Sequence, residues 1–189
     1  MEYLKGVWQG LGTLHPRRFI CGFCGANVGS ASGYWVQGHP EGTEHATTRM
    51  CPNCNRPTYF EGDSQFPGVR FGRAVKHLPP EVQGLYEEAR SCMSVDAYTA
   101  AVMAARKILM NVAVSQGDKP GKRYAEYVDW LEANHFVPPG GKKWVDHIRD
   151  KGNDANHEIP NMTKADAETL INFVEMLLKF IYEFPATVA

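Results

Sequence analysis

Apolar residues recur at helical spacing throughout the second half of the chain, starting after Pro79 and Pro80. Residues three and four positions apart share one face of an α-helix, so each such stripe predicts an amphipathic helix. Proline suits the first turn of a helix, and we therefore place the start of the helical region at these two prolines. The pattern predicts about five helices, with the stripes Val82, Leu85, Tyr86, Ala89 and Met93; Tyr98, Ala101, Val102, Ala105, Leu109 and Val112; Tyr124, Tyr127, Val128 and Leu131; Trp144, Val145 and Ile148; and Leu170, Phe173, Val174, Leu177, Leu178 and Ile181.

The sequence also predicts where two of these helices begin. The second is expected to begin near Asp96. The fifth is expected to begin after Thr163, because a threonine followed three residues later by an acid such as Asp166 can form reciprocal capping hydrogen bonds. The region from residue 79 to residue 189 is therefore predicted to be an all-helical bundle.

The first half of the chain has more glycine and shorter apolar runs. The stretch from Gly22 to Gly42 contains the segment YWVQG, and the segment RPTYFEG follows further on. Short runs of this kind between glycine-containing turns are typical of β-strands. We predict a small β module with its linker over residues 1 to 78, which makes the fold class α+β.

Four of the five cysteines form two close pairs, Cys21 and Cys24 in CGFC and Cys51 and Cys54 in CPNC. Two such turns that face each other complete a tetrahedron of sulfurs, which is the geometry that zinc prefers. Four thiolates also fill the coordination shell and leave no position for water or substrate. The sequence therefore predicts a zinc ribbon with a structural zinc ion, and it argues against zinc-dependent hydrolysis.

Other uses of these cysteines fit the sequence less well. Disulfides need an oxidising compartment, and the opening segment MEYLKGVWQG is not a charged-then-apolar leader. A redox pair would not need a second CxxC. His39 and His45 lie between the two pairs and could replace a cysteine as ligands, although a solvated loop histidine is the commoner case.

Composition and charge narrow the class of protein. A chain of 189 residues that is 43% hydrophobic suits one ordinary domain plus a small metal-stabilised one. No apolar run approaches the length needed to span a membrane, so we expect a soluble cytoplasmic protein with no membrane partner. Residues 1 to 79 hold eight Lys and Arg against five Asp and Glu, while residues 80 to 189 hold twelve against sixteen.

A mildly basic first half beside an acidic second half is not a strong nucleic-acid signature. The first half nevertheless combines arginines with aromatic residues, a pairing that suits single-stranded bases. The same residues would equally serve the solubility and the small core of a ribbon, and the lack of a net basic field favours that interpretation. The residues in question are Arg17, Arg18, Arg49, Arg56, Arg70, Arg73, Tyr34, Trp35 and Tyr59.

Polar residues crowd the segment WVDHIRDKGNDANHE, where a core-facing helix would continue its stripe. On a helix, Arg149, Asn153 and His157 would lie on one side within reach of one another. Histidine can transfer a proton, arginine can neutralise developing charge and asparagine can orient a reacting group, which suits phosphodiester cleavage without metal. The alternative is that the helix ends at Gly152 and Asn153 and that His157 bonds to a backbone carbonyl.

Three stretches of the second half, YTAAVMAARKILM around Arg106, HIRDKGNDANHE and LINFVEMLLKFIYEF, resemble the bacterial family called domain of unknown function 4145. This family is usually placed near the HEPN superfamily of helical-bundle nucleotide-binding and RNase domains. The resemblance covers about residues 79 to 185 and implies an HEPN-like bundle that forms a homodimer. Members often carry a ribbon in front.

Catalytic HEPN domains cut RNA without metal, and their motif is an arginine, a polar residue and then a histidine. The resemblance gives Arg149 the role of transition-state stabiliser, Asp150 that of the polar residue and His157 that of the proton-transfer group. Seven residues separate Arg149 from His157, which is a longer interval than in the motif. Arg106 has no place in the motif and is expected to pair with a carboxylate in the bundle.

Two functions follow from these observations. The favoured one is a non-catalytic dimeric module of bacterial or phage conflict systems, such as phage defence, in which the ribbon grips an RNA or protein partner. The alternative is a metal-independent endoribonuclease with a composite site of Arg149, Asn153 and His157 at the dimer interface. The longer interval in the motif and the acidic bundle, which repels phosphates, favour the module.

Overall fold

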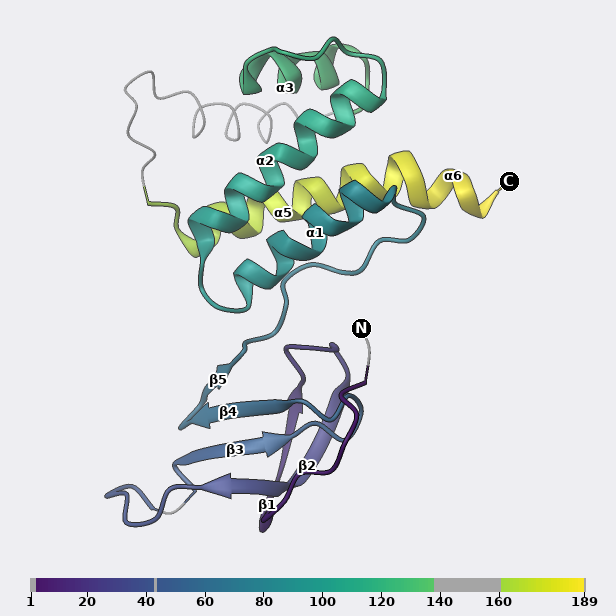
Figure 1. Ribbon diagram of the computed structural model, residues 1–189. Coiled ribbons are helices and arrows are strands. Elements are labelled where there is room, and N and C mark those ends of the chain that lie inside the picture. Colours follow the sequence, from purple (N-terminus) through teal and green to yellow (C-terminus); the bar gives the residue numbers. More distant parts are fainter. Residues whose placement is uncertain (1–2, 43, 138–160, 189) are drawn as a thin grey trace. The chain divides into compact units, whose positions relative to one another are not determined.

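The computed structural model describes residues 3–42, 44–137 and 161–188. The chain forms two compact units, Met1–Arg70 and Phe71–Ala189. The first unit contains an antiparallel β-sheet and the second contains helices (Figure 1), which confirms the predicted α+β class. Within the described ranges, no helix is long and apolar enough to cross a membrane.

The sheet of the first unit is a five-stranded meander in which each strand pairs with the next strand along the chain. All of these pairings are antiparallel. The first cysteine pair lies in the connection between β1 and β2, and the second lies between β3 and β4. Each CxxC segment is therefore the tip of a hairpin. The strands are β1 (Gly12–Ile20), β2 (Asn27–Trp35), β3 (Ala46–Met50), β4 (Pro57–Glu61) and β5 (Ser64–Phe66).

Side chains link the first strand to the last part of the sheet. Arg17 on β1 donates a hydrogen bond of 3.0 Å to the carbonyl of Gly62, and its guanidinium lies 4.2 Å from the centre of the Phe60 ring. Gln65 on β5 donates to the carbonyl of Ile20 at 2.8 Å. An exposed edge strand is a template for unwanted pairing, so these bonds protect part of the β1 edge.

Arg49 on β3 is an internal structural residue. It is only 3% exposed and donates to the carbonyls of His15 at 2.7 Å and Ser30 at 2.9 Å. It also forms an ion pair of 3.1 Å with Glu44. A buried guanidinium needs all of these partners to offset its lost hydration. Arg49 thus ties β3 to β1 and β2, and it does not belong to the exposed arginine face that the sequence suggested.

The helices of the second unit coincide with the predicted stripes. Nearly all of the predicted stripe residues within the described ranges are buried, and Leu85, Tyr98 and Ile181 are half-buried against the same core. The predicted helix around Trp144, Val145 and Ile148 lies outside the described residues. The described helices are α1 (Pro80–Met93), α2 (Tyr98–Ser115), α3 (Tyr124–Ala133), α5 (Lys164–Leu178), the π-helical turn η1 (Lys179–Glu183) and α6 (Phe184–Thr187).

The two predicted helix starts have different outcomes. Thr163 caps α5 as expected, because its hydroxyl accepts from the amide of Asp166 at 3.2 Å and the Asp166 carboxylate accepts from the Thr163 amide at 3.1 Å. Helix α2 begins at Tyr98 with Ala97 as its N-cap. Asp96 lies just before it in a left-handed conformation, with φ of 58°, so it ends the preceding turn and does not cap the helix.

The segment that joins the sheet to α1 is bound to the helices through its backbone. The amide of Arg73 donates to Glu175 at 2.7 Å, and the amide of Lys76 donates to Glu183 at 2.6 Å. The hydroxyl of Tyr86 donates to the carbonyl of Arg73 at 2.9 Å. These bonds explain why the helical unit begins at residue 71, before the first helix.

Candidate metal centre

The first CxxC segment forms a tight turn that points both sulfurs to one side. The amide of Gly25 donates to the carbonyl of Cys21 at 2.8 Å, and the amide of Cys21 donates to the carbonyl of Ala26 at 2.9 Å. Gly25 has φ of 72°, in the left-handed region that glycine adopts without steric cost. The glycine that follows the first cysteine pair therefore allows the chain to reverse directly after it.

The second CxxC segment repeats this turn with Asn55 in the place of the glycine. Asn55 has φ of 61°, and its amide donates to the carbonyl of Cys51 at 2.8 Å. Asparagine is one of the few other residues that enter this region readily. Its side chain also donates to the carbonyls of Leu4 and Gly6, while Trp8 donates to the Asn55 carbonyl at 2.9 Å. Asn55 thus anchors the N-terminal segment to the second turn.

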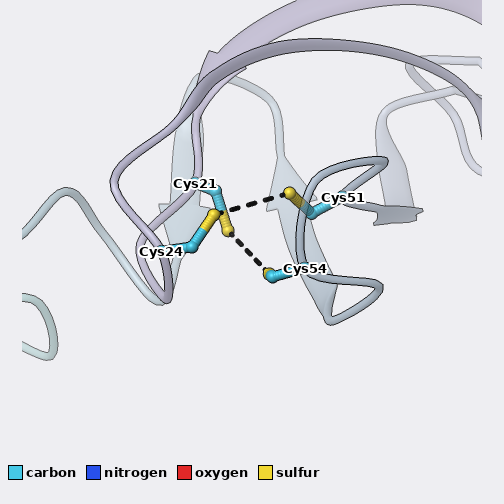
Figure 2. A group of neighbouring side chains, drawn as sticks. All are labelled: Cys21, Cys24, Cys51 and Cys54. Atoms are coloured by element: carbon cyan, nitrogen blue, oxygen red, sulfur yellow. Dashed lines mark hydrogen bonds between the residues drawn. The ribbon is translucent and has the colours of Figure 1, made fainter. Parts of the chain in front are cut away.

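The four sulfurs meet between the two hairpin tips, as Figure 2 shows, and all lie within 4.8 Å of one another. Two of the sulfur pairs are Cys21 with Cys54 at 3.7 Å and Cys24 with Cys51 at 3.8 Å. Four sulfurs at about 2.3 Å from a tetrahedral zinc ion would be about 3.8 Å apart. The cluster can therefore hold a metal ion, and its size is consistent with zinc. Each hairpin supplies two of the four sulfurs, so a bound ion would cross-link the two hairpins.

The surroundings of the sulfurs differ in polarity. Burial raises the pKa of Cys21 and of Cys54. Burial acts in the same direction on Cys24, but hydrogen bonds, chiefly from the Asn53 side chain at 3.4 Å, outweigh it and lower its pKa to about 7. A metal ion would favour the thiolate at every one of these positions, because cysteine binds metals in its deprotonated form.

The cysteines also form a large part of the core of the sheet unit. The buried cluster consists of Cys21, Cys51 and Cys54 with Phe19 and Phe60, whose rings meet edge to face at 5.1 Å. A buried cluster of this size is small for a unit of about 70 residues, and small domains of this kind commonly rely on a metal or disulfides. The cluster therefore lies where a bound ion would stabilise the fold most.

Neither of the alternative histidine ligands joins the cysteines. The rings of His39 and His45 stack on each other with their centres 4.3 Å apart. The Nδ1 atom of His45 lies 2.8 Å from Glu41. Among the described residues, the group that can hold a metal consists of the four cysteines alone.

The helical unit can be assigned to a protein family. A comparison with known families matches residues 87–189 to Domain of unknown function (DUF4145), which is more than half of the chain. The chain belongs to DUF4145. No curated protein and no solved structure matches it. The cysteine cluster lies before the matched region, so the DUF4145 match gives no information about the metal.

The predicted catalytic residues of the DUF4145 region, Arg149, Asn153 and His157, lie outside the described residues, as does Asp150. Their convergence stays a prediction. Arg106 lies on α2 with its guanidinium 4.2 Å from the centre of the Tyr124 ring on α3. This cation–π contact joins two helices of the DUF4145 region, while the expected pairing of Arg106 with a carboxylate stays a prediction.

An aromatic row crosses the exposed side of the sheet, and we define it as Tyr34, Tyr59 and Phe66. Strand register pairs Tyr34 with Thr48, Thr48 with Tyr59, and Tyr59 with Phe66, so these side chains share one face. The three aromatic residues are 38%, 38% and 47% exposed, and the rings of Tyr59 and Phe66 are 6.4 Å apart. Sequence reasoning named Tyr34 and Tyr59 but missed Phe66, whose strand is only three residues long.

The remaining members of the suggested arginine and aromatic face are divided among several tasks. Trp35 covers Gly12, where an added Cβ would lie 2.0 Å from the indole ring. The guanidinium of Arg56 lies 5.4 Å from the centre of the Phe23 ring, while Arg18 is exposed. Arg73 belongs to the helical unit. Unlike the residues of the aromatic row, these arginines therefore do not line one common face.

Proposed function

We propose that the chain is a dimeric module, with a zinc ribbon followed by an HEPN-like bundle, that binds a nucleic-acid or protein partner in bacterial or phage conflict systems. Cys21, Cys24, Cys51 and Cys54 would hold a structural zinc ion. The exposed aromatic row on the metal-stabilised sheet is the observation that supports a binding role. Exposing aromatic side chains to solvent is energetically unfavourable. A contiguous set of exposed aromatic residues therefore commonly marks an interaction surface.

Single-stranded nucleic acid is the partner that the aromatic row favours. Every base has a π-face, and stacking one base on an aromatic side chain contributes about 1–3 kcal/mol. The row supplies three rings on neighbouring and next-neighbouring strands, which are held apart by the sheet. A protein partner remains the other outcome, since tyrosine and phenylalanine are also frequent in protein interfaces.

The charge of the sheet unit suggests how such binding would behave. Residues 1–70 carry six Lys and Arg against five Asp and Glu. With so small a net charge, phosphate contacts would contribute little to the affinity. We therefore expect binding that depends weakly on salt, unlike proteins that neutralise many phosphates.

The test is the affinity of the protein for a fluorescently labelled single-stranded RNA, measured by polarisation. The double variant Tyr59→Ala, Phe66→Ala should bind at least about tenfold more weakly, because it removes two stacking surfaces. Ile20→Ala is the matched control, since Ile20 is an apolar residue of the same unit that is 41% exposed and lies outside the row. Full binding by the double variant, or no RNA binding by the parent protein, would eliminate RNA as the ligand of the row.

Dimerisation through the helical bundle is the second element of the proposal. It rests on the HEPN-like character that the DUF4145 resemblance implies. Sedimentation of the intact protein over a range of concentrations measures it directly, and a monomer at every concentration would refute it. If the polar motif holds the two helical units together, His157→Ala should weaken the dimer or lower its melting temperature.

The alternative function is metal-independent RNA cleavage by Arg149, Asn153 and His157. The expected placement of these three residues on one side of a helix supports it, whereas the long interval between Arg149 and His157 favours the module. Purified protein should then cut mixed RNA without added divalent metal, and His157→Ala should abolish the cleavage while His15→Ala, a histidine of the sheet unit, retains it. RNA that stays intact with the parent protein would rule this function out.

A further inference from the structure

The helical unit contains an open groove of about 660 Å³ that none of the functions above uses. Its walls come from the start of α1, the last turns of α2, the loop before α3, the first turn of α3 and η1. A volume of this size is in the range of pockets that bind small organic molecules. Aliphatic and aromatic side chains make most of the lining: Pro79, Pro80, Val82, Met110, Val114, Pro120, Tyr127 and Tyr182.

The hydroxyl of Tyr182 has a lone pair available to a ligand. The Ser115 hydroxyl donates to the carbonyl of Val112 at 2.9 Å and lies 3.1 Å from the Tyr182 hydroxyl. Because the Ser115 proton is already used, Tyr182 must donate to Ser115, and the Tyr182 oxygen keeps its acceptor capacity. Tyr182 lies in the π-helical turn η1, and such turns occur often at functional sites because the wider backbone redirects side chains.

The charge of the residues that line the groove decides whether a cation or an anion would bind there. Glu81 is the one charged residue among the described residues that line the groove, and no ion pair engages its carboxylate in the described part of the chain. The free amides at the start of α1 contribute the opposite sign, but a helix terminus is equivalent to only about half a charge. The lining therefore stays negative, as does the whole helical unit, which has fourteen Lys and Arg against sixteen Asp and Glu over residues 71–189.

We propose that this groove binds a small organic amine, an ammonium group attached to an apolar body. The ammonium would meet the Glu81 carboxylate and the Tyr182 oxygen as hydrogen-bond acceptors. The apolar body would cover Met110 and Val114, and the partly exposed ring of Tyr182 would attract the cation through its negative face. Anions of the same shape would be excluded, because the described lining offers them no cationic side chain and one repelling carboxylate.

The test compares two probes of nearly equal shape and opposite charge, 2-phenylethylammonium and 3-phenylpropanoate, by calorimetric titration of the full chain at constant ionic strength. The amine should bind saturably, and the carboxylate at least about tenfold more weakly. Glu81→Gln should lower the affinity for the amine about tenfold. Glu88→Gln is the matched control, since it makes the same change on the same helix at an exposed residue outside the groove.

A blocking variant tests the location independently of Glu81. Val114 is 37% exposed, so Val114→Arg should fold normally, fill the groove and abolish amine binding. The melting temperature of each variant verifies folding. The proposal is overturned by equal binding of the two probes, by no saturable binding of the amine, or by full binding in Glu81→Gln or Val114→Arg. RNA binding by the aromatic row is measured separately and should be unchanged in Glu81→Gln.

Discussion

The two units of the protein reach a stable fold by different means. In the helical unit, long stripes from α1, α2, α3 and α5 form one apolar core, as in the fully buried residues Ile108, Leu109 and Leu177. The buried cluster of the sheet unit has two phenylalanines and three cysteines. A bundle can bury enough apolar surface by itself, while small domains such as this sheet commonly rely on a cross-link, which a metal ion on the four cysteines would supply. The comparison implies that each unit can be destabilised without the other.

Removal of the metal should cause the largest loss of stability, and this loss should be confined to the sheet unit. A strong chelator, or the substitution Cys51→Ser, should unfold the sheet, because binding to a structural site of this kind contributes directly to folding. The helical circular dichroism signal should remain. Loss of the helical signal together with the sheet would show that the two units do not fold separately.

A cavity in the helical core should have the next largest effect, on the other unit. Leu109 is fully buried, so Leu109→Ala should lower the free energy of unfolding of the helices by about 2–5 kcal/mol. Met103→Ala is the control on the same helix, since Met103 is 44% exposed and should cost little. Denaturant melts give both values, and metal content should be the same in the two variants. Equal values for the two variants would contradict the assignment of the core.

Loss of the α5 cap should have a smaller effect. Thr163→Ala removes the acceptor for the Asp166 amide, and such a loss typically costs about 1 kcal/mol. Thr163→Ser keeps the hydroxyl and should restore most of this stability. A value near zero for Thr163→Ala, measured by the same melts, would mean that the cap adds nothing to the helical unit.

Low pH should reduce the stability of the helical unit through protonation of Glu175, and we expect this to be the smallest of the four changes in stability. Burial acts to raise the pKa of Glu175, but hydrogen bonds from Lys179 and from the Arg73 amide outweigh it and lower the pKa below its ordinary value of 4.5. A carboxylate with a lowered pKa in the folded state stabilises the fold above the unfolded pKa and loses this contribution as pH falls through the folded pKa. Stability of Glu175→Gln should therefore depend less on pH below about pH 5, while Glu88→Gln should follow the parent protein. Identical pH profiles for Glu175→Gln and the parent would contradict this.

The helical unit was the easier one to predict from the sequence. Stripes such as Tyr124, Tyr127, Val128 and Leu131 identify the helices because their period of 3.6 differs from that of a strand. The pair Thr163 and Asp166 identifies the α5 start because capping is a local interaction. The start of α2 was expected near Asp96 and lies two residues further on, because the left-handed conformation of Asp96 depends on the path of the preceding turn.

The sheet unit shows where sequence reasoning fails. The cysteine pairs identify the cluster because the CxxC spacing has few other uses. Strand β1 was missed because only Leu14 and Phe19 of its nine residues are buried, and Pro16 interrupts the alternation. The burial of Arg49 could not be foreseen, because its acceptors come from three separate segments. The aromatic row likewise depends on strand register, which the sequence does not specify.

Metal content per chain, measured by mass spectrometry on the purified protein, tests the central claim most directly. We expect one zinc ion per chain, held by the four clustered thiolates. Cys51→Ser should lose the zinc, while Cys92→Ser should retain it, since Cys92 packs against the core of the helical unit and is not one of the four clustered cysteines. Absence of zinc from the parent protein, or equal zinc in Cys51→Ser and Cys92→Ser, would contradict a metal-stabilised sheet unit.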